Sequence, residues 1–182
     1  TRPSRATSCG RPWYAPDAAA DRHEQATLTS VAAVLPRRVY LAIGLLETDN
    51  ARRYNSLFVF GPDGRIVARH RKMLLHSFDE RSGTAVAEPN AQVVDVEGFR
   101  CGLSICADAN SRWLMAQYRA KAIDALIYSV TSHVPPTVRW LKYWPMSRRF
   151  GGWVLAANRY GQEDGESYPG TAFVAGPNYR GN

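Results

Sequence analysis

The chain has 182 residues, of which 45% are hydrophobic and 21% charged, an ordinary balance for one folded domain. Its net charge of +7 comes mainly from arginines that are scattered along the chain, without a basic run or a nucleic-acid-binding motif. No apolar run reaches the roughly 18 residues that a membrane-crossing helix needs, and residues 1–20 lack the apolar centre of a signal peptide. We therefore expect a single domain over residues 1–182 that binds neither nucleic acid nor a membrane.

The first half of the chain is predicted to contain a helix, a buried strand and a hairpin. Asp21 can cap a helix that runs to about Leu35. Residues 39–46 form a near-continuous apolar run, which is typical of a strand covered on both faces. The turn sequence GPDG at residues 61–64 separates two apolar or alternating runs, so residues 54–72 are predicted to form a β-hairpin.

The second half of the chain continues with alternating elements after a polar loop over about residues 76–90. The predicted elements are a strand at 100–105, a helix at 111–122, a strand at 123–129, a helix at 137–150 broken near Pro145, and strands at 153–157 and 171–175. Alternation of this kind predicts an α/β fold, in which helices form layers on a sheet.

The chain contains three cysteines, Cys9, Cys101 and Cys106, and their spacing matches no zinc site. Cys101 and Cys106 are an odd number of residues apart, so in one strand their side chains face opposite sides, which argues against a disulfide between them. A sparse set of unpaired cysteines is typical of a reducing compartment, and we expect a cytoplasmic protein. We expect neither a metal ion nor another cofactor.

Cys106 is the strongest candidate for a catalytic residue. It follows a short, apparently buried strand and directly precedes a helical stretch. A helix N-terminus presents unpaired N–H groups and the positive end of the helix dipole, which together stabilise a thiolate nucleophile. The alternative reading is a buried structural cysteine.

The order of short motifs around Cys106 resembles the nitrilase, or carbon–nitrogen hydrolase, superfamily. The matching motifs are Tyr54-Asn55-Ser56, Pro62-Asp63-Gly64, Arg71-Lys72, Glu80 and the pattern G-x-x-x-G-x-x-I-C-x-D from Gly98 to Asp108. The resemblance continues through residues 119–124 and 156–161, and so covers most of residues 39–177. It implies an α-β-β-α sandwich, incomplete in this chain, whose subunits often pair, so a homodimer or higher homo-oligomer is expected.

The residue types and the resemblance together imply a thiol-dependent hydrolase of non-peptide carbon–nitrogen bonds. Cys106 is the expected nucleophile, and Lys72 a fixed positive charge that stabilises the thiolate and the developing oxyanion. The Ala107 N–H is placed to donate to that oxyanion. Glu80, eight residues after Lys72, is expected to orient Lys72 or the substrate, with an exposed loop carboxylate as the alternative. Ala107-Asp108 after the cysteine favours the amidase or carbamoylase branches over true nitrilases, and hence a small amide or carbamoyl substrate.

Three further residues are assigned weaker roles. His133 follows the strand that ends at Ser129, at the rim of the sheet where α/β proteins bind ligands, so it is a candidate for substrate binding, with a surface role as the alternative. Asp108 is expected to be structural and to cap the next helix. His70 is expected to face the same side as Lys72 and to line the wall of the pocket.

One part of the superfamily pattern has no match in this chain. The general-base glutamate is expected ahead of the helix at 21–35, but residues 1–23 contain no glutamate, and neither Glu24 nor Glu47 has the right context. We therefore expect either an internal portion of a longer protein, truncated at both ends, or a non-catalytic relative that keeps the fold. A Cys–His thiol hydrolase is a further alternative, but a glutamine-amidotransferase elbow would require glycines beside Cys106.

Overall fold

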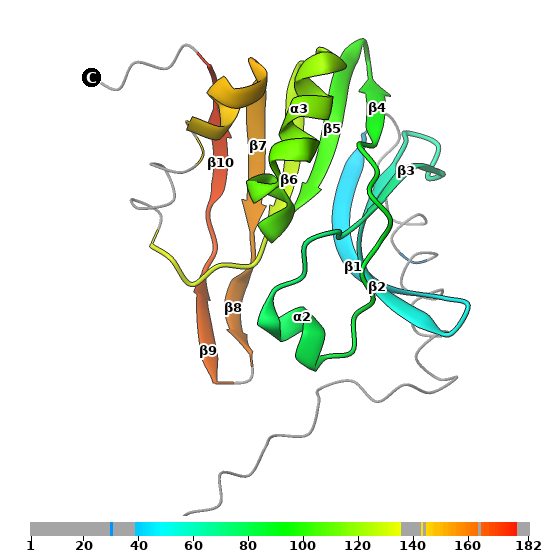
Figure 1. Ribbon diagram of the computed structural model, residues 1–182, viewed down its shortest axis with the longest axis vertical. Coiled ribbons are helices and arrows are strands. Elements are labelled where there is room, and N and C mark those ends of the chain that lie inside the picture. The colour runs from blue at the N-terminus through cyan, green and yellow to red at the C-terminus, as the bar shows by residue number, and fades with distance from the viewer. Residues whose placement is uncertain (1–29, 31–38, 136–142, 144, 164, 178–182) are drawn as a thin grey trace, which may run out of the picture.

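The computed structural model describes residues 30, 39–135, 143, 145–163 and 165–177, and the structural statements below concern those residues. The strands form two larger sheets and a small hairpin (Figure 1). The first sheet is antiparallel, in the order β1 (Leu41–Asp49), β2 (Arg52–Phe60) and β3 (Ile66–Arg71). It contains the hairpin predicted at residues 54–72, and its turn lies at the predicted GPDG sequence.

The second sheet has five strands in the order β10-β7-β6-β5-β4. Its three central strands, β5 (Phe99–Ile105), β6 (Ala125–Val130) and β7 (Trp153–Asn158), are parallel. The strands β4 (Val93–Val96) and β10 (Ala172–Ala175) flank them and are antiparallel to their neighbours. A separate hairpin of β8 (Tyr160–Glu163) and β9 (Glu166–Pro169), which was not predicted, follows β7.

The two faces of β5 show how the layers are built. Cys101, Leu103 and Ile105 point toward the first sheet, where they pack against apolar side chains of β2 and β3. The opposite face lies under the helix α3 (Arg112–Ala120), which buries Leu114, Met115 and Tyr118. Gly102 occupies this face because a Cβ atom there would lie 2.8 Å from Ile123 and 2.9 Å from Tyr118.

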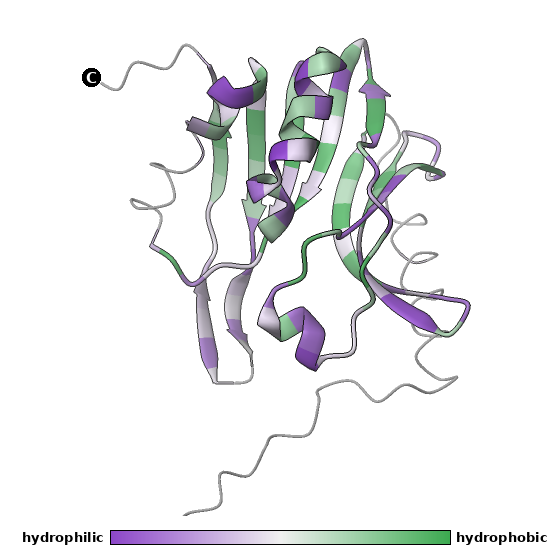
Figure 2. Cartoon of the chain, viewed as in Figure 1, coloured by the Kyte–Doolittle hydropathy of each residue, from purple (hydrophilic) through white to green (hydrophobic). Residues whose placement is uncertain are grey.

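The layers therefore stack as helix, five-stranded sheet and three-stranded sheet, which confirms the expected α/β fold. Figure 2 shows hydrophobic residues concentrated along the central strands, whereas α2 (Ser77–Arg81) and the β1–β2 turn are mostly hydrophilic. The predicted helix at 21–35 lies outside the described residues except for Ser30. The predicted helix at 137–150 is described only at residue 143 and over 145–150, where it is helical.

Two expectations about the first half of the chain were wrong. The polar loop at 76–90 contains the short helix α2. The strand at 39–46 is not covered on both faces, because Glu47 is the single buried residue of β1. None of the described helices is long and apolar enough to cross a membrane.

Candidate active site

Cys106 lies at a sharp turn between β5 and α3. It begins a short 3-10 helix, Cys106–Asn110, and has a φ of 44°, in the left-handed region that non-glycine residues seldom adopt. Such backbone strain persists where surrounding contacts enforce it, and it is common at active sites. The Cys106 thiol is half-buried, whereas Cys101 is buried. The pKa of the Cys101 thiol is raised, mainly by burial and further by the negative charges of Asp124 and Asp95. Of these two cysteines, Cys106 has the more accessible sulfur.

Lys72 directly follows β3 and is buried, with its amino group paired to the carboxylate of Asp79. The Lys72 Nζ lies 2.5 Å from Asp79 Oδ2. Asp79 also accepts hydrogen bonds from the Asn55 side chain at 3.1 Å and the His76 backbone N–H at 2.8 Å. Burial alone would raise the pKa of Asp79, but the hydrogen bonds from Lys72, His76 and Asn55 outweigh burial and lower it. Asp79 therefore stays ionised and fixes the position of Lys72.

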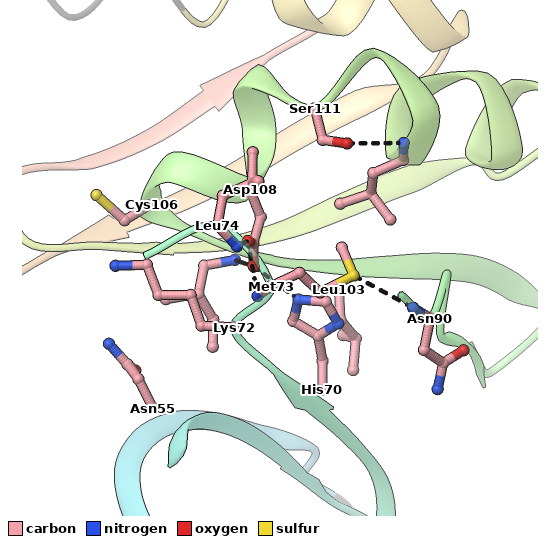
Figure 3. A network of polar contacts seen from close by, with 12 residues as sticks. Asn55, His70, Lys72, Met73, Leu74, Asn90, Leu103, Cys106, Asp108 and Ser111 are labelled. Atoms are coloured by element: carbon pink, nitrogen blue, oxygen red, sulfur yellow. Dashed lines mark hydrogen bonds and ion pairs between the residues drawn. The ribbon is translucent and has the colours of Figure 1, made fainter. Parts of the chain in front are cut away.

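Asp108 connects the Lys72 segment to the Cys106 turn. Its Oδ1 accepts hydrogen bonds from the backbone N–H groups of Met73 and Leu74, at 3.0 and 2.7 Å. Its Oδ2 lies 2.9 Å from the His70 Nε2, and the whole side chain is inaccessible to solvent. Figure 3 shows the Lys72 amino group and the Cys106 sulfur on the same side of this network. Asp108 thus brings together two segments about 35 residues apart in the sequence.

The observed contacts of Asp108 and His70 correct two expectations. Asp108 does not cap α3, because the Ser111 side chain caps it by accepting a hydrogen bond from the Leu114 N–H at 3.2 Å. His70 does not line a pocket wall, because its ring is buried against Asp108, with the Nδ1 atom lacking a partner among the described residues.

The expectation that Glu80 orients Lys72 was also wrong, because the neighbouring carboxylate has that role. Glu80 lies on α2 and its side chain is exposed, whereas Asp79, one residue earlier, is buried and bonded to Lys72. Adjacent residues of a helix point about 100° apart, so only one of the two can face Lys72. Asp79 also accepts a hydrogen bond from His76 N–H, three residues before it. This bond holds Asp79 at the start of α2, but no local pattern in the sequence distinguishes Asp79 from Glu80 as the residue that faces Lys72.

The other two predicted substrate-binding residues lie in different places. Ala107 is half-buried in the 3-10 turn, next to Cys106 as expected. The exposed His133 lies against β9, with its Nδ1 3.6 Å from the Glu166 carboxylate and its ring centre 4.4 Å from that of Tyr168. Its observed contacts are thus those of a surface residue.

The Tyr54-Asn55-Ser56 motif organises two separate networks from one strand. Asn55 holds Asp79, whereas Ser56 donates to Glu47 with 2.5 Å between Oγ and Oε2. Glu47 is also paired with Arg69 at 2.6 Å and with Arg71 at 2.5 Å. Burial raises the pKa of Glu47, but the hydrogen bonds and charges of these partners outweigh it and lower the pKa. Glu47 is therefore engaged by arginines and is a poor proton acceptor.

No cluster of three or more His, Cys, Asp or Glu side chains among the described residues is arranged to hold a metal ion. The groups that the arrangement offers for chemistry are a half-buried thiol, a fixed ammonium group and the backbone of the turn that carries the thiol.

Comparison with protein families relates this arrangement to known sequences. The carbon–nitrogen hydrolase family matches residues 8–180. Omega-amidase NIT2-B of Xenopus laevis is 32% identical over 98 residues, which are 50% of this chain and 36% of that protein. The chloroplastic omega-amidase of Arabidopsis thaliana is 34% identical over 89 residues, 45% of this chain and 24% of that protein. The aligned part thus spans about a third or less of these relatives.

Solved structures with the same fold are more distant in sequence. An amidase variant from Nesterenkonia sp. AN1, whose active-site cysteine carries the acetamide moiety of fluoroacetamide, matches with a TM-score of 0.78 and 18% identity. The match covers 86% of this chain and 61% of that one. The glutamine-dependent NAD+ synthetase of Acinetobacter baumannii matches with a TM-score of 0.76 and 21% identity, over 85% of this chain and 30% of that one. At these identities the likeness supports the fold.

Proposed function

This chain belongs to the carbon–nitrogen hydrolase family, and we propose that it hydrolyses small amides through a covalent intermediate on Cys106. The amidase relatives favour an amide over a carbamoyl substrate. The observation that carries the proposal is the Asp108 network, which holds the backbone beside Lys72 against the turn that carries Cys106. A purely structural role for these residues would not account for a half-buried thiol in a left-handed conformation and a buried ammonium group on the same side of the Asp108 network.

The first step is attack of the Cys106 thiolate on the amide carbonyl carbon. A sulfur–carbon bond forms, and the carbonyl π electrons move to the oxygen, which becomes an oxyanion. The Ala107 N–H and the Lys72 ammonium stabilise this charge. Lys72 is suited to this role because an ammonium group has three N–H donors, and Asp79 accounts for one of them among the described contacts.

The second step is collapse of the oxyanion, which breaks the carbon–nitrogen bond and releases ammonia or an amine. The leaving nitrogen must receive a proton, and a water molecule must then lose one to hydrolyse the thioester. The described carboxylates nearest these residues are poorly suited to this task. Asp79 is bound to Lys72, Asp108 to backbone N–H groups and Glu47 to arginines. The proposal therefore requires a further proton-transferring carboxylate.

Labelling of the cysteines tests the nucleophile. In the intact chain, iodoacetamide near neutral pH should modify Cys106 faster than Cys101, because the Cys106 thiol is half-buried and lies on the same side of the Asp108 network as the Lys72 ammonium, whereas burial protects Cys101. Lys72→Ala should slow the modification of Cys106 by about tenfold. Lys121→Ala, which removes a lysine bonded to the Ala91 carbonyl, is the matched control and should leave the rate unchanged. Equal labelling of both cysteines, unaffected by Lys72→Ala, would contradict the proposal.

Amide turnover tests the requirement for a further carboxylate. We expect the 182-residue chain to hydrolyse short aliphatic amides near the background rate, because general acid–base catalysis is worth roughly 10²–10⁴-fold. An extended chain that includes a first strand–helix unit with a glutamate should be active. If the 182-residue chain did turn over such amides, and Glu24→Gln or Glu47→Gln abolished that turnover, a local carboxylate would be acting as the base. Homo-oligomeric assembly stays a prediction, which sedimentation analysis can check.

A further inference from the structure

The carbonyl oxygen of Cys106 is held by a tyrosine from the neighbouring strand. The Tyr128 hydroxyl donates a hydrogen bond to this oxygen, with 2.9 Å between the two oxygen atoms. Tyr128 lies on β6, which pairs in parallel with β5, and only 1% of it is exposed. Burial raises the pKa of Tyr128 far above its usual range, so the hydroxyl keeps its proton and remains a donor.

This hydrogen bond also determines the direction of the Ala107 N–H, because the Cys106 carbonyl and the Ala107 N–H belong to one peptide unit. A peptide unit is planar, and in the trans form its carbonyl and N–H point in opposite directions. No cis peptide bond occurs in the described part of the chain. The Ala107 N–H therefore points away from Tyr128 and from the apolar core in which the tyrosine lies.

The Cys106 turn requires such support because its backbone is strained. A φ of 44° at a non-glycine residue is retained only where the surroundings enforce it. Asp108 fastens the turn to the Lys72 segment from one side. Tyr128 holds the peptide unit that directly follows the strained residue. The Tyr128 ring in turn packs edge-to-face with the Tyr143 ring, with 5.6 Å between the ring centres, which limits movement of the phenol.

We propose that Tyr128 is a positioning residue that aims the Ala107 N–H at the oxyanion formed during attack by Cys106. This inference rests on the proposed function. Tyr128 acts through the Cys106–Ala107 peptide unit and contacts neither the sulfur nor the substrate. Its hydroxyl should therefore affect reactions of Cys106 that pass through an oxyanion, and leave other reactions of the thiol unchanged.

Two reagents separate these kinds of reaction. With p-nitrophenyl acetate, the thiolate adds to the carbonyl carbon, and the resulting oxyanion expels p-nitrophenolate and leaves an acetyl thioester. This leaving group needs no proton, so the reaction does not depend on a general acid. With iodoacetamide, the sulfur displaces iodide at a saturated carbon, and no oxyanion forms. Peptide mass spectrometry of the full chain identifies the cysteine that each reagent modifies.

Tyr128→Phe is the main variant, because it removes the hydroxyl and keeps the packed ring. We expect acetylation of Cys106 to become about tenfold slower, the effect of a misaligned oxyanion donor, while iodoacetamide alkylation stays within about twofold. Tyr118→Phe is the matched control. The Tyr118 hydroxyl is also buried and bonds to the backbone of β5, but at Leu103 instead of Cys106. It should leave both rates unchanged.

Each other outcome has a definite meaning. If Tyr128→Phe left the acetylation rate unchanged, or lowered the acetylation and alkylation rates equally, the positioning role of Tyr128 would be overturned and the proposed function would stand. Failure of the unaltered chain to become acetylated at Cys106 would overturn the proposed function, and the positioning role with it. If Tyr128→Phe does not fold, 3-fluorotyrosine at position 128 supplies a second variant that keeps the hydroxyl. It should retain both rates, and a selective loss of acetylation there would contradict the proposal.

Discussion

Glu47 and Asp79 are two buried carboxylates held by the same hairpin, and their surroundings differ in one decisive respect. Glu47 is surrounded by Ser56 and two arginines, which use both of its oxygens. Asp79 is paired with a single ammonium group, that of Lys72. Arg71 and Lys72 are adjacent in the sequence, so one strand end supplies a cation to each network. At Glu47 the neutralised charge stabilises the fold. At Asp79 it also holds a cation on the same side of the Asp108 network as the Cys106 sulfur.

The difference follows from the shape of the two cations. Arginine presents a planar fork of donors that matches a carboxylate, and Arg71 bridges Glu47 and Asp49 with it. It also stacks on Tyr54, at 4.1 Å from the ring centre, which further restricts it. The ammonium group of Lys72 is compact and has three donors, so a single carboxylate leaves it able to bind a second anion. This is the property that an oxyanion-binding group needs.

The largest expected effect is the loss of the carboxylate beside Lys72. Asp79→Asn leaves the Lys72 ammonium buried without a counter-charge, which should lower the free energy of unfolding by about 3 kcal/mol. Glu80→Gln, on the exposed side of α2, is the matched control and should change stability by less than about 0.5 kcal/mol. Urea denaturation of both variants measures the difference. A larger effect from Glu80→Gln would restore Glu80 as the partner of Lys72.

Breaking the arginine network should destabilise the protein without changing the thiol. Glu47→Gln removes the shared counter-charge of Arg69 and Arg71, at a cost of about 2 kcal/mol, because both guanidinium groups retain some contact with water. Iodoacetamide alkylation of Cys106 should stay within about twofold of the parent rate. Slower alkylation by an order of magnitude would show that the two networks are not independent.

Both carboxylates should contribute to acid denaturation. Their pKa values are lowered in the folded protein from ordinary values of 4.5 for Glu47 and 3.8 for Asp79. Their stabilising contribution is therefore complete above those values and is lost as the pH falls through the lower pKa of the folded state. Below about pH 4, Glu47→Gln and Asp79→Asn should each reduce the slope of the unfolding free energy against pH. Denaturant titrations at several acidic pH values check this, and unchanged slopes would contradict it.

The smallest effects should come from two adjacent residues of the Tyr54-Asn55-Ser56 motif. Ser56→Ala and Asn55→Ala each remove a hydrogen bond to a carboxylate and should cost about 1–2 kcal/mol. Only Asn55→Ala should also slow the alkylation of Cys106, by a few-fold, because Asn55 helps to aim Asp79 at Lys72. Equal alkylation rates in the two variants would mean that Lys72 is positioned without Asn55.

The sequence by itself determined the order of the main strands and the two segments that carry the site, but not α2, β4 or the β8–β9 hairpin. The GPDG turn, the alternation along β2 and β3, and the short strand before Cys106 depend on local conformational preferences and on side-chain periodicity. These are properties of neighbouring residues, so they can be read without the fold. The ordered family motifs added the expectation that Lys72 and Cys106 act together.

Only the tertiary structure decided which polar groups meet. The choice of Asp79 over Glu80 depends on how α2 is rotated against Lys72, a rotation that no local pattern determines. Asp108 was expected to cap the next helix, yet it bonds the Met73 and Leu74 N–H groups, about 35 residues earlier in the chain. The Tyr128 hydroxyl reaches Cys106 from a neighbouring strand, 22 residues later in the chain. Most buried polar groups are hydrogen-bonded, and the packing of distant segments selects their partners.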